Sequence, residues 1–238
     1  WCSEKTNGRI PDFMDYLAPA SKLILLNALY FNGVWESPFK KENTKSDLFS
    51  TSTGEQKRVD FMQQYPQGYN FVTDEQVTLA ELPYGNGAFS MTIVLPHENV
   101  SLNEWMKQLN VTHWKSLQSK MTSQTLRVKL PKFKIESKDF LTEALKKTGI
   151  FEAFTEGADF SNLSKDGLFV SDIMQANYFC IDEQGTEASA VTATVQVTSP
   201  GSVATVIDFY VNRPFLFVLK ENSTGAILFL GRINAPSI

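Results

Sequence analysis

The segment from residue 186 to residue 197 constrains this sequence more than any other. It holds one charged residue, Glu187, and neither Pro nor Gly, so nothing in it prevents strand formation. Read with period two, both faces carry small side chains, which would let such a strand enter an existing sheet without displacing bulky neighbours. Residues 199–202 (SPGS) then end it at an exposed tip. A surface linker and an ordinary edge strand are the alternative interpretations of the segment by itself.

The composition describes a globular chain. The sequence has 238 residues, of which 42% are hydrophobic, and its net charge of −4 comes without a basic stripe, so we expect no nucleic-acid partner. Polar residues interrupt every apolar run before about 18 residues, which argues against a membrane span. The opening WCSEKTNGRI lacks an initiator Met and a signal pattern, so a longer protein is expected. Spacing does not decide whether Cys2 and Cys180 pair.

The first half of the chain predicts strands followed by two helices. Residues 21–33 are nearly continuously apolar and predict a buried central strand, in which Asn27 would need internal partners. Trp35 is expected to fill a corner of a core. Turn-separated alternation over residues 69–96 predicts a three-stranded meander, and residues 101–120 predict two short helices.

The second half predicts more strands around one helix. Residues 125–137 read as two strands, residues 139–148 as a helix packed on the sheet, and residues 167–183 as a long strand. Residues 214–231 predict a final hairpin. Strands come in runs and outnumber helices, so we expect an α+β fold with large antiparallel or mixed sheets and several helices.

Catalytic and metal-binding motifs are missing from the sequence. The two histidines, His97 and His113, lie far from any nucleophile motif, and two Cys with two His at scattered positions make no zinc site. We therefore expect no enzyme activity, no metal and no cofactor.

Four stretches together resemble the serpins. They are NALYFNGVW at 27–35, VKLPKFKIES at 128–137, IDEQGTEASA at 181–190 and VNRPFLFVL at 211–219. The resemblance covers the whole chain and implies the larger C-terminal part of one serpin domain, residues 1–238, without the N-terminal helices. It places an exposed reactive loop at about residues 183–205.

The resemblance implies an inhibitor that works by changing shape. A protease cleaves a bond of the loop and stays attached to it as an acyl-enzyme. The freed loop then enters the main sheet as a new strand. The implied loop hinge consists of Glu183, Gly185, Thr186, Glu187, Ala188, Ser189 and Ala190. The small residues at alternate positions favour an active inhibitor over a non-inhibitory member.

The resemblance also implies a region where the sheet opens, made of Asn27, Trp35, Lys132 and Gln175. Glu183 is expected to form an ion pair with Lys132 at the base of the loop, although partly exposed pairs contribute little. The family often has a His where this chain has Gln175. We expect Asn27 to bond this amide instead.

The position of the scissile bond is ambiguous, because the loop looks a few residues longer than is usual in the family. The candidates are Val197, Thr198, Ser199, Pro200 and Val203. Counting from the hinge gives Ser199 before Pro200, whereas counting back from Pro214 gives Val203. No Arg, Lys or aromatic residue lies between Ala188 and Val206, which favours elastase-like or subtilisin-like serine proteases, with some cysteine proteases as further targets.

Three functions compete at this point. The first is a suicide inhibitor of serine proteases, the second a non-inhibitory serpin acting as carrier or chaperone, and the third an unrelated β-rich enzyme or adhesin. The small side chains of the hinge favour the first function over the second. The missing catalytic motifs argue against the third. The family suggests a monomer, located outside the cell or in the cell envelope.

Overall fold

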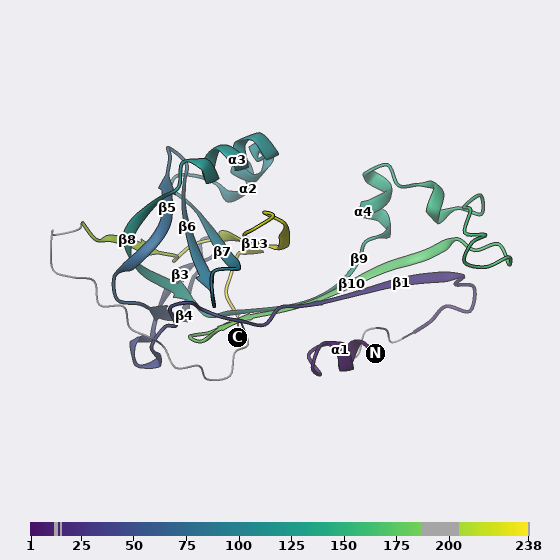
Figure 1. Cartoon of the computed structure of the whole chain (residues 1–238), viewed down its shortest axis with the longest axis horizontal. Helices are drawn as coiled ribbons and strands as arrows, with labels where there is room; N and C mark the ends of the chain where they lie inside the picture. Colours follow the sequence, from purple (N-terminus) through teal and green to yellow (C-terminus); the bar gives the residue numbers. More distant parts are fainter. Residues whose placement is uncertain (12–13, 15, 187–204, 238) are drawn as a thin grey trace. The chain divides into compact units, whose positions relative to one another are not determined.

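The computed structural model describes residues 1–11, 14, 16–186 and 205–237. The chain divides into two compact units, shown in Figure 1. The first comprises Trp1–Phe31 and Lys134–Phe179, and the second comprises Asn32–Phe133 and Cys180–Ile238. The expectation of a single domain over residues 1–238 stays a prediction.

The first unit is built on a parallel strand pair. Strands β1 (Leu23–Tyr30) and β10 (Val170–Ile181) run side by side in Figure 1, and β9 (Phe133–Phe140) also pairs with β10. The unit also contains α1 (Cys2–Lys5), α4 (Thr142–Lys147) and a short 3-10 helix, η2 (Glu152–Phe154). The long strand predicted from residue 167 is thus present as β10.

Strand β1 is where predicted, but the prediction that it is buried was wrong. Leu25, Leu26 and Asn27 are all exposed. Consecutive strand residues point to opposite faces of a sheet, so the part of the chain that the structure describes covers neither face of β1 at these positions. The apolar run at residues 21–33 therefore predicted the strand correctly but not its burial.

The helix predicted at residues 139–148 is shorter than expected. Its first two residues, Asp139 and Phe140, belong to β9, and α4 covers only Thr142–Lys147. Phe140 is 65% exposed, so the apolar stripe that suggested a helix does not face a core. The start of α4 is attached to β10 by polar bonds instead: the amide of Ile173 donates to Thr142 Oγ1 at 3.1 Å.

The second unit is dominated by a nine-stranded sheet. Its order is β14-β13-β7-β6-β5-β8-β4-β3, and β12 pairs in parallel with β8. The strands are β3 (Lys45–Ser50), β4 (Gln56–Gln63), β5 (Gln67–Thr73), β6 (Val77–Tyr84), β7 (Phe89–Pro96), β8 (Thr122–Pro131), β12 (Ile207–Tyr210), β13 (Phe215–Glu221) and β14 (Ile227–Ile233). The antiparallel pairs β5–β6–β7 and β13–β14 confirm the predicted meander and final hairpin.

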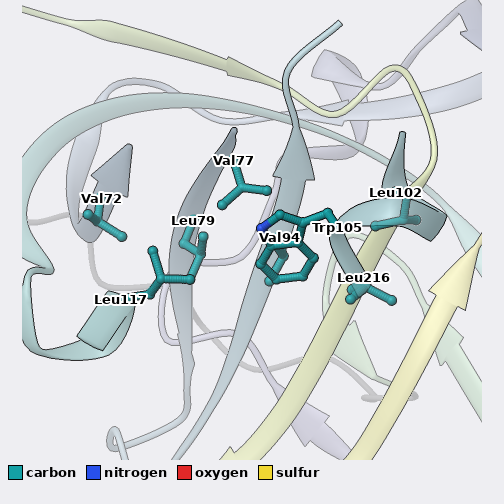
Figure 2. Close-up of a cluster of buried hydrophobic side chains, with 8 residues drawn as sticks. All are labelled: Val72, Val77, Leu79, Val94, Leu102, Trp105, Leu117 and Leu216. Carbon is teal, nitrogen blue, oxygen red and sulfur yellow. The ribbon is translucent and has the colours of Figure 1, made fainter. Parts of the chain in front are cut away.

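The two predicted helices are present, and they cover part of this sheet. Helix α2 (Leu102–Gln108) begins at Ser101, whose Oγ accepts from the amide of Glu104, and α3 (Val111–Ser119) begins at Asn110. Figure 2 shows Trp105 of α2 and Leu117 of α3 beside side chains of the strands. The cluster consists of Val72, Val77, Leu79, Val94, Leu102, Trp105, Leu117 and Leu216. Its burial fixes both helices on the sheet because apolar area leaves water.

Two short strands complete the second unit. Strand β2 (Gly33–Val34) pairs in antiparallel fashion with β11 (Gly185–Thr186), and η1 (Lys41–Asn43) follows β2 along the chain. Strand β11 also pairs with Ile181 at the end of β10. The turn between β10 and β11 leads directly to the segment at residues 186–197.

Candidate functional site

The site begins with a tight turn at residues 182–185. The amide of Asp182 donates to the carbonyl of Gly185 at 2.9 Å, and the amide of Gly185 donates back at 3.2 Å. The side chain of Asp182 strengthens this turn, because its Oδ1 accepts from the amides of Gln184 at 2.8 Å and Gly185 at 3.2 Å. The chain thereby reverses from β10 into β11.

Gly185 is required at the end of this turn. Its φ of +146° is a conformation that other residues rarely adopt. A Cβ at this position would lie 2.1 Å from the carbonyl oxygen of Gly33 and 2.8 Å from the Cα of Val34. The backbone of β11 can therefore approach β2 only without a side chain at residue 185.

Glu183 is held by three neighbours in the second unit. Lys132 Nζ lies 3.0 Å from its Oε2, and Thr44 Oγ1 donates to its Oε1 at 2.7 Å. Its carbonyl accepts from the amide of Phe39 at 2.8 Å. The predicted ion pair with Lys132 is confirmed, and it is more buried than expected, since the Glu183 side chain is only 5% exposed.

The pKa of Glu183 reflects two opposing effects. Burial raises the pKa of this carboxyl, while hydrogen bonds from Thr44, its own backbone and Lys132, together with the charge of Lys132, lower it. The lowering effects prevail, so the pKa lies below its usual value. Glu183 is therefore the charged partner of Lys132 at neutral pH.

Thr186, the last residue described before residue 187, is buried and 0% exposed. Its Oγ1 lies 2.8 Å from the hydroxyl of Tyr84. Burial raises the pKa of Tyr84, which keeps the phenol protonated and able to donate. The start of the next segment is thus already placed between Gly33 of β2 and Ile181 of β10.

Trp35 supports the same turn. It is buried, as expected for a residue that fills a core, and its ring stacks on Tyr84 with the centroids 4.3 Å apart. Its Nε1 donates to the carbonyl of Asp182 at 3.0 Å, and its amide donates to the carbonyl of Gln184 at 2.9 Å. Trp35 thus combines packing with direct support of residues 182–184.

The remaining two residues of the expected sheet-opening region lie in the first unit. Asn27 and Gln175 are register partners in the pair β1–β10. The amide of Gln175 donates to Oδ1 of Asn177 at 3.0 Å, and Asn177 donates to Ser137 Oγ at 3.1 Å. The expected bond between Asn27 and Gln175 was wrong: Asn27 is exposed to solvent, and Gln175 finds its partner on its own strand.

The rest of the expected loop lies outside the described residues. This applies to the hinge residues Glu187, Ala188, Ser189 and Ala190, and to all five scissile-bond candidates, Val197, Thr198, Ser199, Pro200 and Val203. Their roles stay predictions.

Sequence reasoning missed two residues of the site. Thr44 and Tyr84 are 139 and 102 residues away from their partners Glu183 and Thr186. Neither belongs to a motif. Tyr84 had one weak signal, its place as an aromatic residue just before the turn of the predicted meander.

Comparison with known proteins identifies the fold around this turn. The family described as Serpin (serine protease inhibitor) matches residues 1–236. The chain belongs to the serpin family. Iripin-3 from Ixodes ricinus is 37% identical over 98% of this chain and 60% of its own length. The leukocyte elastase inhibitor from Xenopus tropicalis is 34% identical over 99% of this chain and 64% of its own length.

A solved structure gives the same answer for the fold. Human thyroxine-binding globulin in complex with thyroxine is similar with a TM-score of 0.88 and 26% identity, over 99% of this chain and 62% of that one. The predicted serpin-like α+β fold is therefore confirmed. The chain spans 60% of the length of Iripin-3, so the activity of a whole serpin does not transfer to it directly.

The described residues contain no group of three or more His, Cys, Asp or Glu side chains suited to a metal ion. Within the same part of the chain, no helix has the length and apolar character needed to cross a membrane.

Proposed function

We propose that this serpin chain takes part in the inhibition of serine proteases by strand insertion. A protease would cleave the reactive loop at about residues 183–205, form an acyl-enzyme, and be held because the freed loop enters the sheet. The observation that carries this proposal is Thr186, which is fully buried as a strand residue at the start of the loop. Insertion would continue a pairing that has already begun.

The sequence of the loop agrees with insertion. A segment of about 14 residues spans roughly 45 Å as a strand, enough to move an attached protease across a domain. Pairing on both edges would add on the order of ten hydrogen bonds of about 1 kcal/mol each. The small side chains at Ala188 and Ala190 keep the steric cost of entry low.

Three contacts support a hinge role for residues 183–186. They are the Lys132–Glu183 ion pair, the turn of Asp182 and the contact of Gly185 with β2. They hold residues 183–186 in one place, so that bending during insertion would occur at the residues that follow. Glu187, Ala188, Ser189 and Ala190 would complete this hinge.

The proposed targets are proteases with small or aliphatic primary specificity. Val197, Thr198, Ser199, Pro200 and Val203 remain the candidates for the cleaved bond, and a bond into Pro200 is a poor substrate. A relative at 34% identity bears the name leukocyte elastase inhibitor, which supports elastase-like enzymes. Subtilisin-like and some cysteine proteases are further candidates. We propose a monomer that acts outside the cell or in the cell envelope.

A carrier function is the second candidate, because thyroxine-binding globulin has a similar structure and its name states a bound small molecule. The loop carries small side chains and no charge after Glu187, which favours inhibition over this alternative. A carrier would not need a loop that is able to pair as a central strand of the sheet.

The test is to mix the protein with pancreatic elastase and analyse the mixture by denaturing gel electrophoresis and mass spectrometry. We expect a stable covalent complex and a released peptide whose new N-terminus lies between Thr198 and Ala204. Cleavage without a complex, and without a gain in thermal stability, would show that the loop does not insert and would favour the carrier.

A further inference from the structure

Four Asn residues of this chain stand in the pattern Asn-X-Ser/Thr, in which X is not Pro. They are Asn99, Asn110, Asn162 and Asn222. The pattern is the acceptor of N-linked glycans in proteins that pass through the eukaryotic secretory pathway. It also arises by chance, so the surroundings of each side-chain amide have to decide which of the four positions can carry a glycan.

Asn99 and Asn162 occupy the same place in two exposed turns. The turn at residues 97–100 lies between β7 and α2 and is closed by a hydrogen bond of 2.9 Å from its last amide to its first carbonyl. The turn at residues 160–163 lies between η2 and β10 and is closed in the same way at 2.8 Å. Each Asn is the third residue of its turn and is exposed, and Leu163 beside Asn162 is 65% exposed.

The side-chain amides of these two residues take no part in the fold. Within the described residues, neither Asn99 nor Asn162 makes a side-chain hydrogen bond. Their Nδ2 atoms therefore keep both hydrogens available. A glycan attached at either position would remain in water and would replace no contact of the folded chain.

Asn222 differs because both atoms of its amide are bound. Its Nδ2 donates to the carbonyl of Gly87 at 2.8 Å, and its Oδ1 accepts from the hydroxyl of Ser90 at 2.7 Å. The hydroxyl of Thr224, the third residue of the pattern, donates to the carboxylate of Glu221. A glycan at Asn222 would attach to the nitrogen that lies against the backbone of Gly87.

Asn110 is also bound through its amide, since it is the residue at which α3 begins. Its Oδ1 accepts from the amide of His113 at 2.9 Å, and its Nδ2 donates to the carbonyl of Gln108 at 3.3 Å. Such a cap stabilises the first turn of a helix. Formation of α3 therefore withdraws the amide of Asn110 from reaction.

We propose that Asn99 and Asn162 carry N-linked glycans and that Asn110 and Asn222 do not. The co-reactant is an oligosaccharide joined to a lipid pyrophosphate. Nδ2 forms a bond to the first carbon of the oligosaccharide, the bond from that carbon to the pyrophosphate breaks, and Nδ2 gives up one proton. This inference rests on the proposed location outside the cell, and it is independent of protease inhibition.

The experiment maps glycans on the protein secreted from human cells behind a removable signal peptide. Cleavage after lysine residues places the four patterns in different peptides. Enzymatic release of the glycans in heavy-oxygen water then labels each modified Asn for mass spectrometry. We expect occupancy at Asn110 and Asn222 to be at least about tenfold lower than at Asn99 and Asn162, the factor that one hydrogen bond to a folded partner represents.

Variants of the glycan-free protein from bacteria test whether the amides have the roles described. Asn222→Gln should lower the thermal midpoint by about 4 °C because two hydrogen bonds are lost. Asn99→Gln and Asn162→Gln are the matched controls and should change it by less than about 2 °C, as is usual for exposed positions.

Two outcomes would overturn the proposal. One is an unmodified Asn99 or Asn162, or a glycan at Asn110 or Asn222 that is as frequent as theirs. The other is an equal loss of stability in Asn99→Gln and Asn222→Gln. Neither measurement involves a protease, so failure of this proposal and failure of the proposed inhibition are distinguished by the separate elastase experiment.

Discussion

Lys132 Nζ lies 3.0 Å from Glu183 Oε2, and this ion pair joins the residue that follows β8 to the turn between β10 and β11. The two side chains are 24% and 5% exposed. Most ion pairs on the surface contribute little, because water and salt screen them. This pair differs because the carboxylate is buried and also accepts from Thr44.

The first prediction concerns the loss of this charge. Glu183→Gln should lower the free energy of unfolding by about 2 kcal/mol, because Lys132 would keep its charge without a charged partner. Urea unfolding of the variant measures this. Glu136→Gln is the matched control, since Glu136 pairs with Lys134 at 2.7 Å but is 59% exposed, and it should cost less than about 1 kcal/mol. Equal losses in both variants would contradict the special role of Glu183.

The second prediction is that this stabilisation is lost in acid. The pKa of Glu183 in the folded protein lies below its ordinary value of 4.5, because the hydrogen bonds outweigh the effect of burial. The contribution is therefore complete above pH 4.5 and decreases as the pH falls through the lower folded-state pKa. The difference in unfolding free energy between the unchanged protein and Glu183→Gln should narrow over this range. A constant difference down to acid pH would contradict the lowered pKa.

The third prediction compares two glycines with positive φ. Gly185→Ala should cost about 3 kcal/mol or more, because its Cβ would meet the backbone of Gly33 and Val34 as well as an unfavourable φ. Gly54 has a φ of +83° and no atom within 4 Å of the added Cβ, so Gly54→Ala should cost only about 1 kcal/mol. Thermal unfolding of both variants distinguishes close approach from backbone strain. Equal costs would mean that β11 can move away from β2.

The sequence predicted those parts of the fold that local patterns determine. Alternation and turn residues located β5, β6 and β7, and Ser101 marked the start of α2. Local patterns failed where the surroundings decide. Leu25 reads as core but is exposed because none of the described residues covers β1 at that point. Phe140 continues a strand instead of starting a helix.

The site shows the same division. Asp182 and Gly185 belong to residue types that favour turns. The Lys132–Glu183 pair was expected from the family resemblance. The contacts of Thr44 and Tyr84 join residues more than 100 positions apart, and single hydroxyl groups leave no periodic signal in a sequence. Such contacts become visible only once the strands are paired.

The fourth prediction concerns the attachment of β12 to the strands β3 and β8. Asp47 of β3 forms an ion pair with Lys129 of β8, and Lys129 Nζ lies 4.1 Å from the ring centroid of Tyr210 in β12. The hydrogen bond from Lys129 lowers the pKa of Asp47 from 3.8 to about 2, helped by the amide of Leu48 and by Tyr210. The contribution to stability is thus present above pH 3.8 and lost as the pH falls towards about 2.

Asp47→Asn should flatten the pH dependence of unfolding in this range. Because Asp47 is 44% exposed, the effect should shrink with added salt. Unfolding measured between pH 4.5 and pH 2, at low and high salt, tests this. An unchanged pH profile would show that Lys129 does not hold Asp47 in its charged form.

The fifth prediction tests the strand insertion itself. Thr186 is fully buried beside Tyr84, so Thr186→Arg would bring a charge to a position without room or a partner for it. The loop should still be cleaved by elastase, since the change lies at least ten residues before the candidate bonds, but the fraction of covalent complex should fall about tenfold, equivalent to about 1.4 kcal/mol at the entry step. Gel electrophoresis with mass spectrometry separates cleavage from trapping.

Thr186→Val is the matched control for this variant. It keeps the size of the side chain and loses only the bond to Tyr84, so it should cost about 1 kcal/mol of stability and still trap the protease. If Thr186→Arg traps elastase as well as the unchanged protein, insertion does not depend on residue 186 being buried. If both variants lose trapping equally, the hydrogen bond between the hydroxyl groups of Thr186 and Tyr84 is the decisive contact. The entry of the loop would then depend on this bond more than on the space around residue 186.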